Sequence, residues 1–259
     1  MSEYFWKQYE DLPSGLGYMR FSAEHIVTLL ILGVLLILTV RILSAKESRR
    51  AASMKVLPWI MVGLEIFKDT FLACTGHFSV GYLPLHLCSL GVFVFIAASL
   101  AKTDRWRMIW SEIACVLIVP ASVAALIFPD WAHLYPVFNF MNLYGYVWHG
   151  MLLLYPAMMV KSGWSHLSVR HAHYVWIFMV GAAIPVYIFD RAADCNYMFV
   201  NWPPKGTPLE WIAGVTGESM YLLGYAAFAV IVIGLIYAGI ELYHRARGIG
   251  GAETKNDTD

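Results

Sequence analysis

Seven apolar stretches constrain what this chain can fold into. Each is close to the roughly 20 residues that an α-helix needs to cross a bilayer. Of 259 residues, 59% are hydrophobic and 14% charged, whereas a soluble domain averages about 25% charged residues. We therefore predict an all-α membrane protein, a seven-transmembrane helix bundle in the cell membrane. The expected spans are residues 24–44, 56–75, 83–101, 107–128, 137–160, 173–190 and 218–241.

Lysine and arginine are distributed unevenly between the connections. Of the 18 basic residues, thirteen flank the first, third and fifth connections or follow the last span, four lie on the opposite side, and Lys68 falls within a span. The positive-inside rule then places the N-terminus outside and the C-terminus in the cytoplasm. We expect an interfacial arm over residues 1–21, one transmembrane domain over 22–245 and a disordered cytoplasmic tail over 246–259.

Composition also excludes several classes of function. The net charge is zero and no basic block is present, so the sequence has no electrostatic footprint for nucleic acid. The four cysteines lack the spacing of a structural zinc site, and we predict neither a metal nor a cofactor. A disulfide between Cys74 and Cys195 is left open. The sixth connection, residues 191–217, is rich in Pro and Gly, so we expect an irregular lid without a helix.

The third stretch begins with Leu83-Pro84-Leu85-His86-Leu87-Cys88-Ser89, where an imidazole, a thiol and a hydroxyl interrupt the apolar pattern. Polar groups in hydrocarbon are costly unless they find partners, so another part of the chain should meet this segment. Cys88 is either an inert buried thiol or a nucleophile, and a nucleophile needs a base to form the thiolate. The candidate bases are His86 and His149. On a regular helix His86 and Cys88 point to opposite sides, which favours His149.

The second stretch contains three charged residues, Glu65, Lys68 and Asp69, on one helical face. Charges at this depth cost at least about 2.5–3.5 kcal/mol each on insertion scales. Two interpretations stay open. The three side chains form an internally paired patch that fixes helix packing, or they form the wall of a pocket for a charged headgroup.

The fifth stretch carries a polar stripe, Asn139, Asn142, Tyr146 and His149, on an otherwise apolar helix. Such a stripe must face the interior of the bundle, where it serves either as contact between helices or as part of a site. His149 is the stronger chemical candidate because Gly150 leaves room beside it. Three further candidates complete one outward-facing pocket: His25, Asn196 and Tyr197.

Several of these residues carry a resemblance to a known family. The motifs are Phe21-Ser22-Ala23-Glu24-His25, the Leu83–Ser89 segment, His149-Gly150, and Asn196-Tyr197-Met198-Phe199-Val200-Asn201 followed by proline. Together they resemble the YwaF family of multi-pass membrane proteins over roughly residues 20–245. That family is similar to a eukaryotic transmembrane phospholipid acyltransferase with a Cys/His pair, and more distantly to the androgen-induced-gene lipid hydrolases. The resemblance implies that Cys88 is the nucleophile and His149 the base.

Three functions of different classes follow from the sequence. The first is a lipid-modifying enzyme, a Cys/His acyltransferase or acyl hydrolase that acts on phospholipid acyl esters through a thioester. The second is a transporter or lipid-binding protein with an outward-facing polar pocket. The third is a structural or accessory membrane protein. In the first two, membrane lipids are the partners, and only the enzyme requires the sulfur of Cys88.

Overall fold

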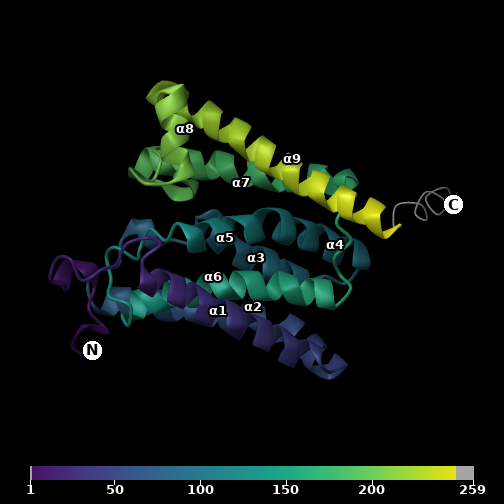
Figure 1. Ribbon diagram of the computed structural model, residues 1–259, viewed down its shortest axis with the longest axis horizontal. Helices are drawn as coiled ribbons and strands as arrows, with labels where there is room; N and C mark the ends of the chain where they lie inside the picture. Colours follow the sequence, from purple (N-terminus) through teal and green to yellow (C-terminus); the bar gives the residue numbers. More distant parts are fainter. Residues whose placement is uncertain (1, 249–259) are drawn as a thin grey trace.

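A computed structural model describes residues 2–248 and shows helices and turns without strands in that range (Figure 1). A π-helical turn, Ala114–Ile118, joins two of the helices into one continuous rod. The α-helices are α1 (Ala23–Ser44), α2 (Glu47–Cys74), α3 (Leu87–Leu100), α4 (Asp104–Ile113), α5 (Val119–Ile127), α6 (Phe140–Lys161), α7 (Ala172–Ala193), α8 (Pro208–Thr216) and α9 (Tyr221–Arg247).

Each expected span corresponds to a helix or to the α4–α5 rod. Within the described residues, four helical segments are long and apolar enough to cross a membrane: Ala23–Ser44, Asp104–Ile127, Val169–Ala193 and Glu218–Arg247. Charges lower the apolar character of α2, and α3 has only 14 residues. Length and composition therefore support four crossings directly, and the seven-span count remains a prediction.

The third span begins later than predicted. Residues 83–86 precede α3, with His86 at the N-cap in an extended conformation. Leu83 is extended, as expected of a residue that precedes proline, and the backbone is still extended at His86. His86 therefore lies just before α3 and Cys88 within it, so the prediction that both residues lie on one regular helix is wrong.

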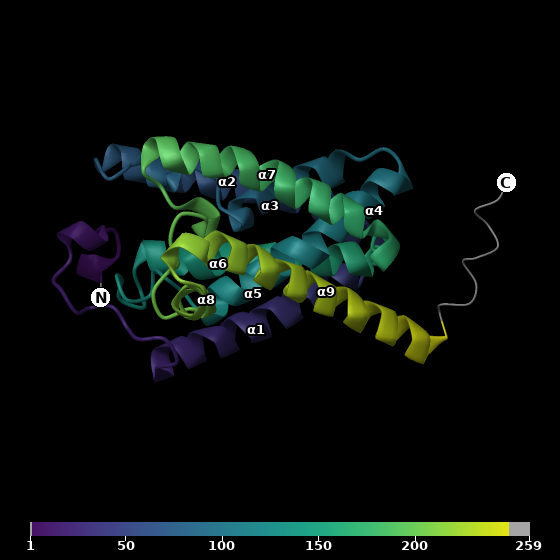
Figure 2. The ribbon, with the colours of Figure 1, turned by 90° about the horizontal axis from the view of Figure 1, so that it is seen from above.

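The helices form two layers, which are seen one above the other in Figure 1. Helices α1 to α6 pack around one core, in which Met61, Phe95, Ile118, Leu152 and Tyr155 are completely buried. Helices α7, α8 and α9 form the second layer (Figures 1 and 2). Most of α7 and α9 is exposed along its length, as expected of helices whose remaining surface meets lipid.

The N-terminal arm, residues 2–21, lies across one end of the bundle, here called the arm end. The Asn139 side chain donates to the carbonyls of Tyr4 (2.8 Å) and Lys7 (2.9 Å). A β-carbon on Gly17 would lie 2.0 Å from the carbonyl oxygen of His133, so only glycine permits this close approach. The predicted interfacial arm is thus a folded part of the bundle end.

The sixth connection contains a helix that we did not predict. Helix α8 begins with Pro208 at its first position, where proline is favoured because that N–H needs no intrahelical partner. Gly217 ends the helix with φ +79°. The Tyr221 hydroxyl, at the start of α9, donates to the carbonyl of Phe199 (2.7 Å), which ties the connection to the second layer.

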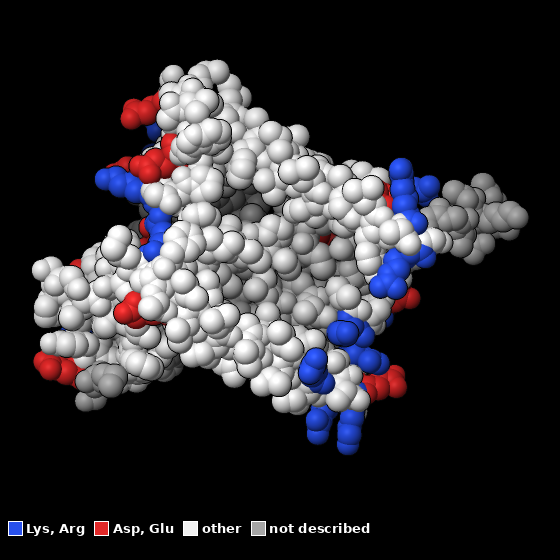
Figure 3. All heavy atoms as spheres, in the orientation of Figure 1, with Lys and Arg blue, Asp and Glu red and all other residues white. Residues whose placement is uncertain are grey.

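Lysine and arginine gather at the other end of the bundle, here called the basic end, where α9 terminates (Figure 3). Helix α9 continues to Arg247, so the predicted tail begins two residues too early; residues 249–259 lie outside the described part of the chain. All four cysteines are free, and the disulfide left open between Cys74 and Cys195 is not formed.

Candidate functional site

Cys88 lies in the first turn of α3, close to the arm end of the bundle. It is partly exposed and packs against the main apolar core. One turn further along the same face, Gly91 is buried. A β-carbon on Gly91 would lie 2.8 Å from Leu152 of α6 and 2.9 Å from Ile118. The absence of a side chain at Gly91 therefore lets three helices approach closely just below Cys88.

The register of α3 and α6 places Cys88 and His149 at one level. Cys88 lies three residues before Gly91, and His149 lies three residues before Leu152. Both helices start at the arm end and run in the same direction (Figure 1). Further along, Phe95 and Tyr155 follow this register to within one residue, with ring centres 4.6 Å apart.

No hydrogen bond joins Cys88 to His149 in the described part of the chain. Catalytic hydrogen bonds are often long before substrate binds, so the absence of this hydrogen bond is compatible with a catalytic pair.

His149 has the tautomer that a general base requires. Its Nδ1 lies 2.7 Å from the carbonyl oxygen of Gly145, and because a carbonyl only accepts, Nδ1 carries the proton. Nε2 then keeps its lone pair. Trp131 stacks on the imidazole with ring centres 5.1 Å apart and planes 9° apart. A protonated imidazole would gain a cation–π interaction with that indole.

Two residues of this site were missed by the sequence analysis. Ser122 of α5, a helix that packs against both α3 and α6, is completely buried, and its hydroxyl donates to the carbonyl of Ile118 (2.7 Å). Trp131 lies in the loop before α6. A single serine or tryptophan carries no local pattern. Gly145 allows the close packing, because a β-carbon there would lie 2.6 Å from the indole of Trp131.

His86 is the N-cap residue of α3, two residues before Cys88. The backbone N–H of Met198 donates to His86 Nδ1 (3.2 Å), so the ring proton of a neutral His86 is on Nε2. The rings of Tyr197 and Phe199 pack against the imidazole at 4.9 and 5.5 Å. Met198 and Phe199 have φ values of 52° and 59°, a left-handed conformation that is strained for residues other than glycine.

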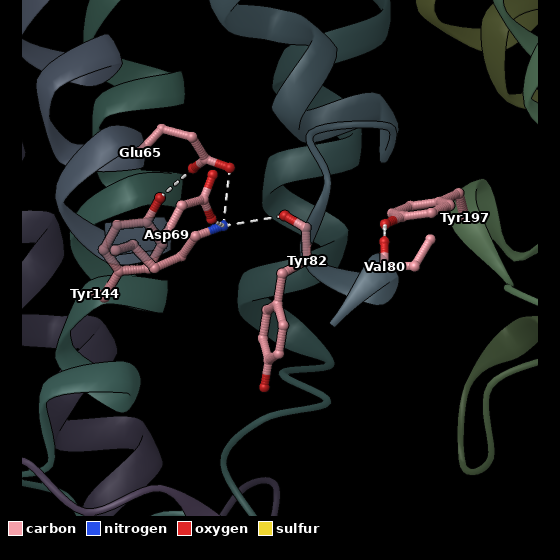
Figure 4. A network of polar contacts seen from close by, with 7 residues as sticks. Glu65, Asp69, Val80, Tyr82, Tyr144 and Tyr197 are labelled. Carbon is pink, nitrogen blue, oxygen red and sulfur yellow. Dashed lines mark hydrogen bonds and ion pairs between the residues drawn. The ribbon is translucent and has the colours of Figure 1, made fainter. Parts of the chain in front are cut away.

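Glu65, Lys68 and Asp69 form a paired charge cluster (Figure 4). The Lys68 ammonium lies 2.8 Å from Glu65 Oε1 and 3.0 Å from Asp69 Oδ1. It also donates to the carbonyl of Tyr82 (3.3 Å), and the Tyr144 hydroxyl donates to Glu65. This geometry favours the packing interpretation of the two left open, because every charge in the cluster has a partner.

The predicted polar stripe divides into a cap, a structural network and a site residue. Asn139 is the N-cap of α6, accepting from the Met141 N–H. Asn142 accepts from the Tyr18 hydroxyl of the arm (2.9 Å), which lies 3.0 Å from the Tyr146 hydroxyl. Only His149, deeper in the helix, reaches the level of Cys88.

The side chains of the remaining candidates form hydrogen bonds with backbone groups. His25 is completely buried, accepts from the N–H of Phe21 and donates to the carbonyl of Leu126 (2.9 Å). Asn196 accepts from the N–H groups of Asn201 and Trp202. Tyr197 differs, since its ring packs on His86 while its hydroxyl donates to the carbonyl of Val80 (Figure 4).

Gly150 makes room for Leu32 of α1, whose Cδ1 would lie 2.8 Å from an added β-carbon. The space expected beside His149 is thus filled by helix packing. No group of three or more His, Cys, Asp or Glu side chains within residues 2–248 is arranged to hold a metal ion.

Comparison with known proteins identifies the family of this chain. No curated protein matches the chain, and no solved structure matches it. The sequence motifs resemble the YwaF family, and that likeness stays a prediction, as does the likeness to acyltransferases. The matching family model covers residues 20–237, from the end of the arm into α9. The chain is an integral membrane protein and belongs to the TMEM164 family.

Proposed function

We propose that this protein is a lipid acyltransferase or acyl hydrolase that acts on phospholipid acyl esters through a thioester on Cys88. One observation carries the proposal. The register set by Gly91 and Leu152 gives Cys88 and His149 a common level, and His149 keeps a free Nε2 lone pair there. A thiol and a neutral imidazole are the components of nucleophilic acyl transfer.

In the first step, His149 Nε2 takes the proton of the Cys88 thiol, and the sulfur attacks the ester carbonyl carbon. The carbon–sulfur bond forms, the ester carbon–oxygen bond breaks, and His149 returns the proton to the leaving lysophospholipid oxygen. In the second step, His149 takes the proton of an acceptor hydroxyl, and its oxygen attacks the carbonyl carbon of the thioester. The new carbon–oxygen bond forms, the carbon–sulfur bond breaks, and His149 returns the proton to the Cys88 sulfur. A lysophospholipid acceptor gives transfer, and water gives hydrolysis.

His86 is suited to stabilise the developing charge on the carbonyl oxygen. Its Nδ1 accepts from the Met198 N–H, and the hydrogen bonds within residues 2–248 include none from Nε2. A fixed N–H donor that is aimed at an oxyanion stabilises the transition state by about 2.7–4 kcal/mol in acyl-transfer enzymes. The strained Met198–Phe199 segment would hold this ring in place.

A lipid can reach the level of Cys88 and His149 through the side of the bundle. The surface is hollowed between α9 and the layer of α1 to α6 (Figure 3). Tyr225 of α9 packs against the same apolar cluster as Leu87 and Leu90, the neighbours of Cys88. An acyl chain that entered between the two layers would thus meet apolar walls, with the polar groups of the site beyond them.

The proposal includes seven spans, with the arm outside and the basic end in the cytoplasm. In this arrangement residues 22–245 form the transmembrane domain. Cysteines introduced singly at Ser48 and Lys205 are expected to react with an impermeant thiol reagent from opposite sides of sealed vesicles, because these sites flank opposite ends of the bundle. The background is a variant that lacks the exposed Cys74. Labelling of both positions from one side would contradict the topology.

Covalent chemistry distinguishes this function from the alternatives. Purified protein incubated with phospholipid and no acceptor is expected to gain the mass of one acyl chain, removable by neutral hydroxylamine, on the peptide that contains Cys88. Cys115 is the matched control because it is also partly buried within a helix. An unmodified Cys88 peptide under turnover conditions would instead favour a lipid-binding protein or transporter, which needs the hollow but not the sulfur.

A further inference from the structure

A groove between α4 and α7 lies at the basic end, far from Cys88. Its volume is about 460 Å³, within the roughly 300–1,000 Å³ of small-molecule sites. Its walls run from Arg105 to Ile113 on α4 and from Tyr174 to Phe178 on α7, and they are otherwise apolar or aromatic. Eight residues along α4 correspond to about 12 Å of helix, so the groove extends inward from the basic end.

Arg105 supplies a positive charge at the mouth of this groove. The residue is exposed, and its guanidinium donates to the Tyr174 hydroxyl (3.4 Å). Its neighbour Arg107 is already paired with Asp104 (3.0 Å). Among the residues that the structure describes, no carboxylate forms an ion pair with Arg105. The mouth therefore offers a charge that an anion can neutralise.

Aromatic side chains indicate the depth in the bilayer at which the mouth of the groove lies. Trp106 is 52% exposed and stacks on Trp110, with ring centres 6.1 Å apart. Tryptophan and tyrosine favour the headgroup level of a bilayer, and Tyr174 lies beside Arg105 at the same end. A guanidinium at this level is placed to bind a phosphate with two parallel N–H groups.

We propose that the α4–α7 groove binds a phospholipid with a net negative headgroup. The phosphate contacts Arg105, and one acyl chain lies along the groove between α4 and α7. Charge complementarity selects this occupant, since a helix of another membrane protein would bring no phosphate to Arg105. The site lies at the opposite end of the bundle from Cys88 and does not depend on the proposed catalysis.

Native mass spectrometry of the full-length protein in detergent tests the binding. Titration with phosphatidylglycerol and with phosphatidylcholine of the same acyl chains is expected to give about fivefold tighter binding of the anionic lipid, the effect of one cation near the surface. Arg105→Gln should abolish this preference. Arg41→Gln, an exposed arginine in the last turn of α1, should keep it. A preference that survives Arg105→Gln would overturn the proposal.

A second measurement locates the lipid. Phosphatidylglycerol with a photoreactive group on its acyl chain is expected to label residues 104–113 and 172–178. Ile177→Trp, which adds bulk to the groove wall, should reduce that labelling without changing Arg105. Labelling confined to other segments would also overturn the site, even if Arg105→Gln weakened binding.

Discussion

Cys88→Ala is expected to reduce phospholipid acyl transfer and hydrolysis to the uncatalysed background, because no other group can form the thioester. The fold should survive, since alanine replaces a small, partly exposed residue that behaves as a minor apolar group. His149→Gln should lose about 10²–10⁴-fold, the contribution of a positioned general base. The measurement is turnover of labelled phospholipid in membranes that carry equal amounts of each variant.

Two comparisons separate a catalytic pair from two unrelated effects. The double variant Cys88→Ala/His149→Gln should be no less active than Cys88→Ala alone, because residues that act as a unit are not additive. Cys115→Ala should retain full activity, since Cys115 lies in the π-helical turn with its thiol near Ser165 (4.0 Å). Full activity in Cys88→Ala would exclude the thioester mechanism and leave the binding or transport function.

The positions of the helices could be predicted because apolar length is a strong local signal. The predicted first span, residues 24–44, and α1, Ala23–Ser44, differ by one residue at the start. The predicted helix boundaries were wrong where local backbone conformation overrides composition. Helix α3 begins only at Leu87, after an extended His86, and Pro208 begins α8 in a connection that its composition had marked as irregular.

The site was less predictable because it depends on the register between helices. Sequence chemistry selected Cys88 and His149, but nothing in the sequence states that Gly91 meets Leu152 and thereby sets the two at one level. Trp131, which stacks on His149, comes from a loop with no periodic pattern. For Asn142, the sequence left open whether the side chain forms a contact between helices or part of a site. In the structure it accepts from Tyr18 of the arm, more than a hundred residues away in sequence.

The cluster around Lys68 contains contacts that the sequence predicts and contacts that it does not. A spacing of three residues predicted the contact between Glu65 and Lys68, because such neighbours share a helical face, and this ion pair is confirmed. The second ion pair joins the adjacent residues Lys68 and Asp69, which the helical spacing does not predict. The Tyr144 hydroxyl and the Tyr82 carbonyl come from distant parts of the chain. These partners satisfy groups that the spacing alone leaves unpaired, and they link α2 to α6 and to the segment before α3.

Lys68→Met is expected to destabilise the detergent-solubilised protein by about 3–5 kcal/mol, the usual cost of removing one partner of a buried ion pair. The side chains of Lys68 and Glu65 are only 8% and 14% exposed. The carboxylates that lose their partner in Lys68→Met therefore cannot become fully hydrated. A change of this size corresponds to a Tm lower by roughly 6–20 °C for a chain of this length. Thermal unfolding monitored by intrinsic fluorescence measures it.

Two further variants show whether pairing is the cause. Lys55→Met removes an exposed lysine from the same helix and should change Tm little, because an exposed charge has little desolvation to lose. Lys68→Met/Glu65→Gln/Asp69→Asn removes all three charges and should be more stable than Lys68→Met, since no uncompensated carboxylate remains. If the single variant is at least as stable as the triple variant, the cluster is not held by its ion pairs. The charges at Glu65 and Asp69 would then be free for the headgroup role that the packing interpretation denies them.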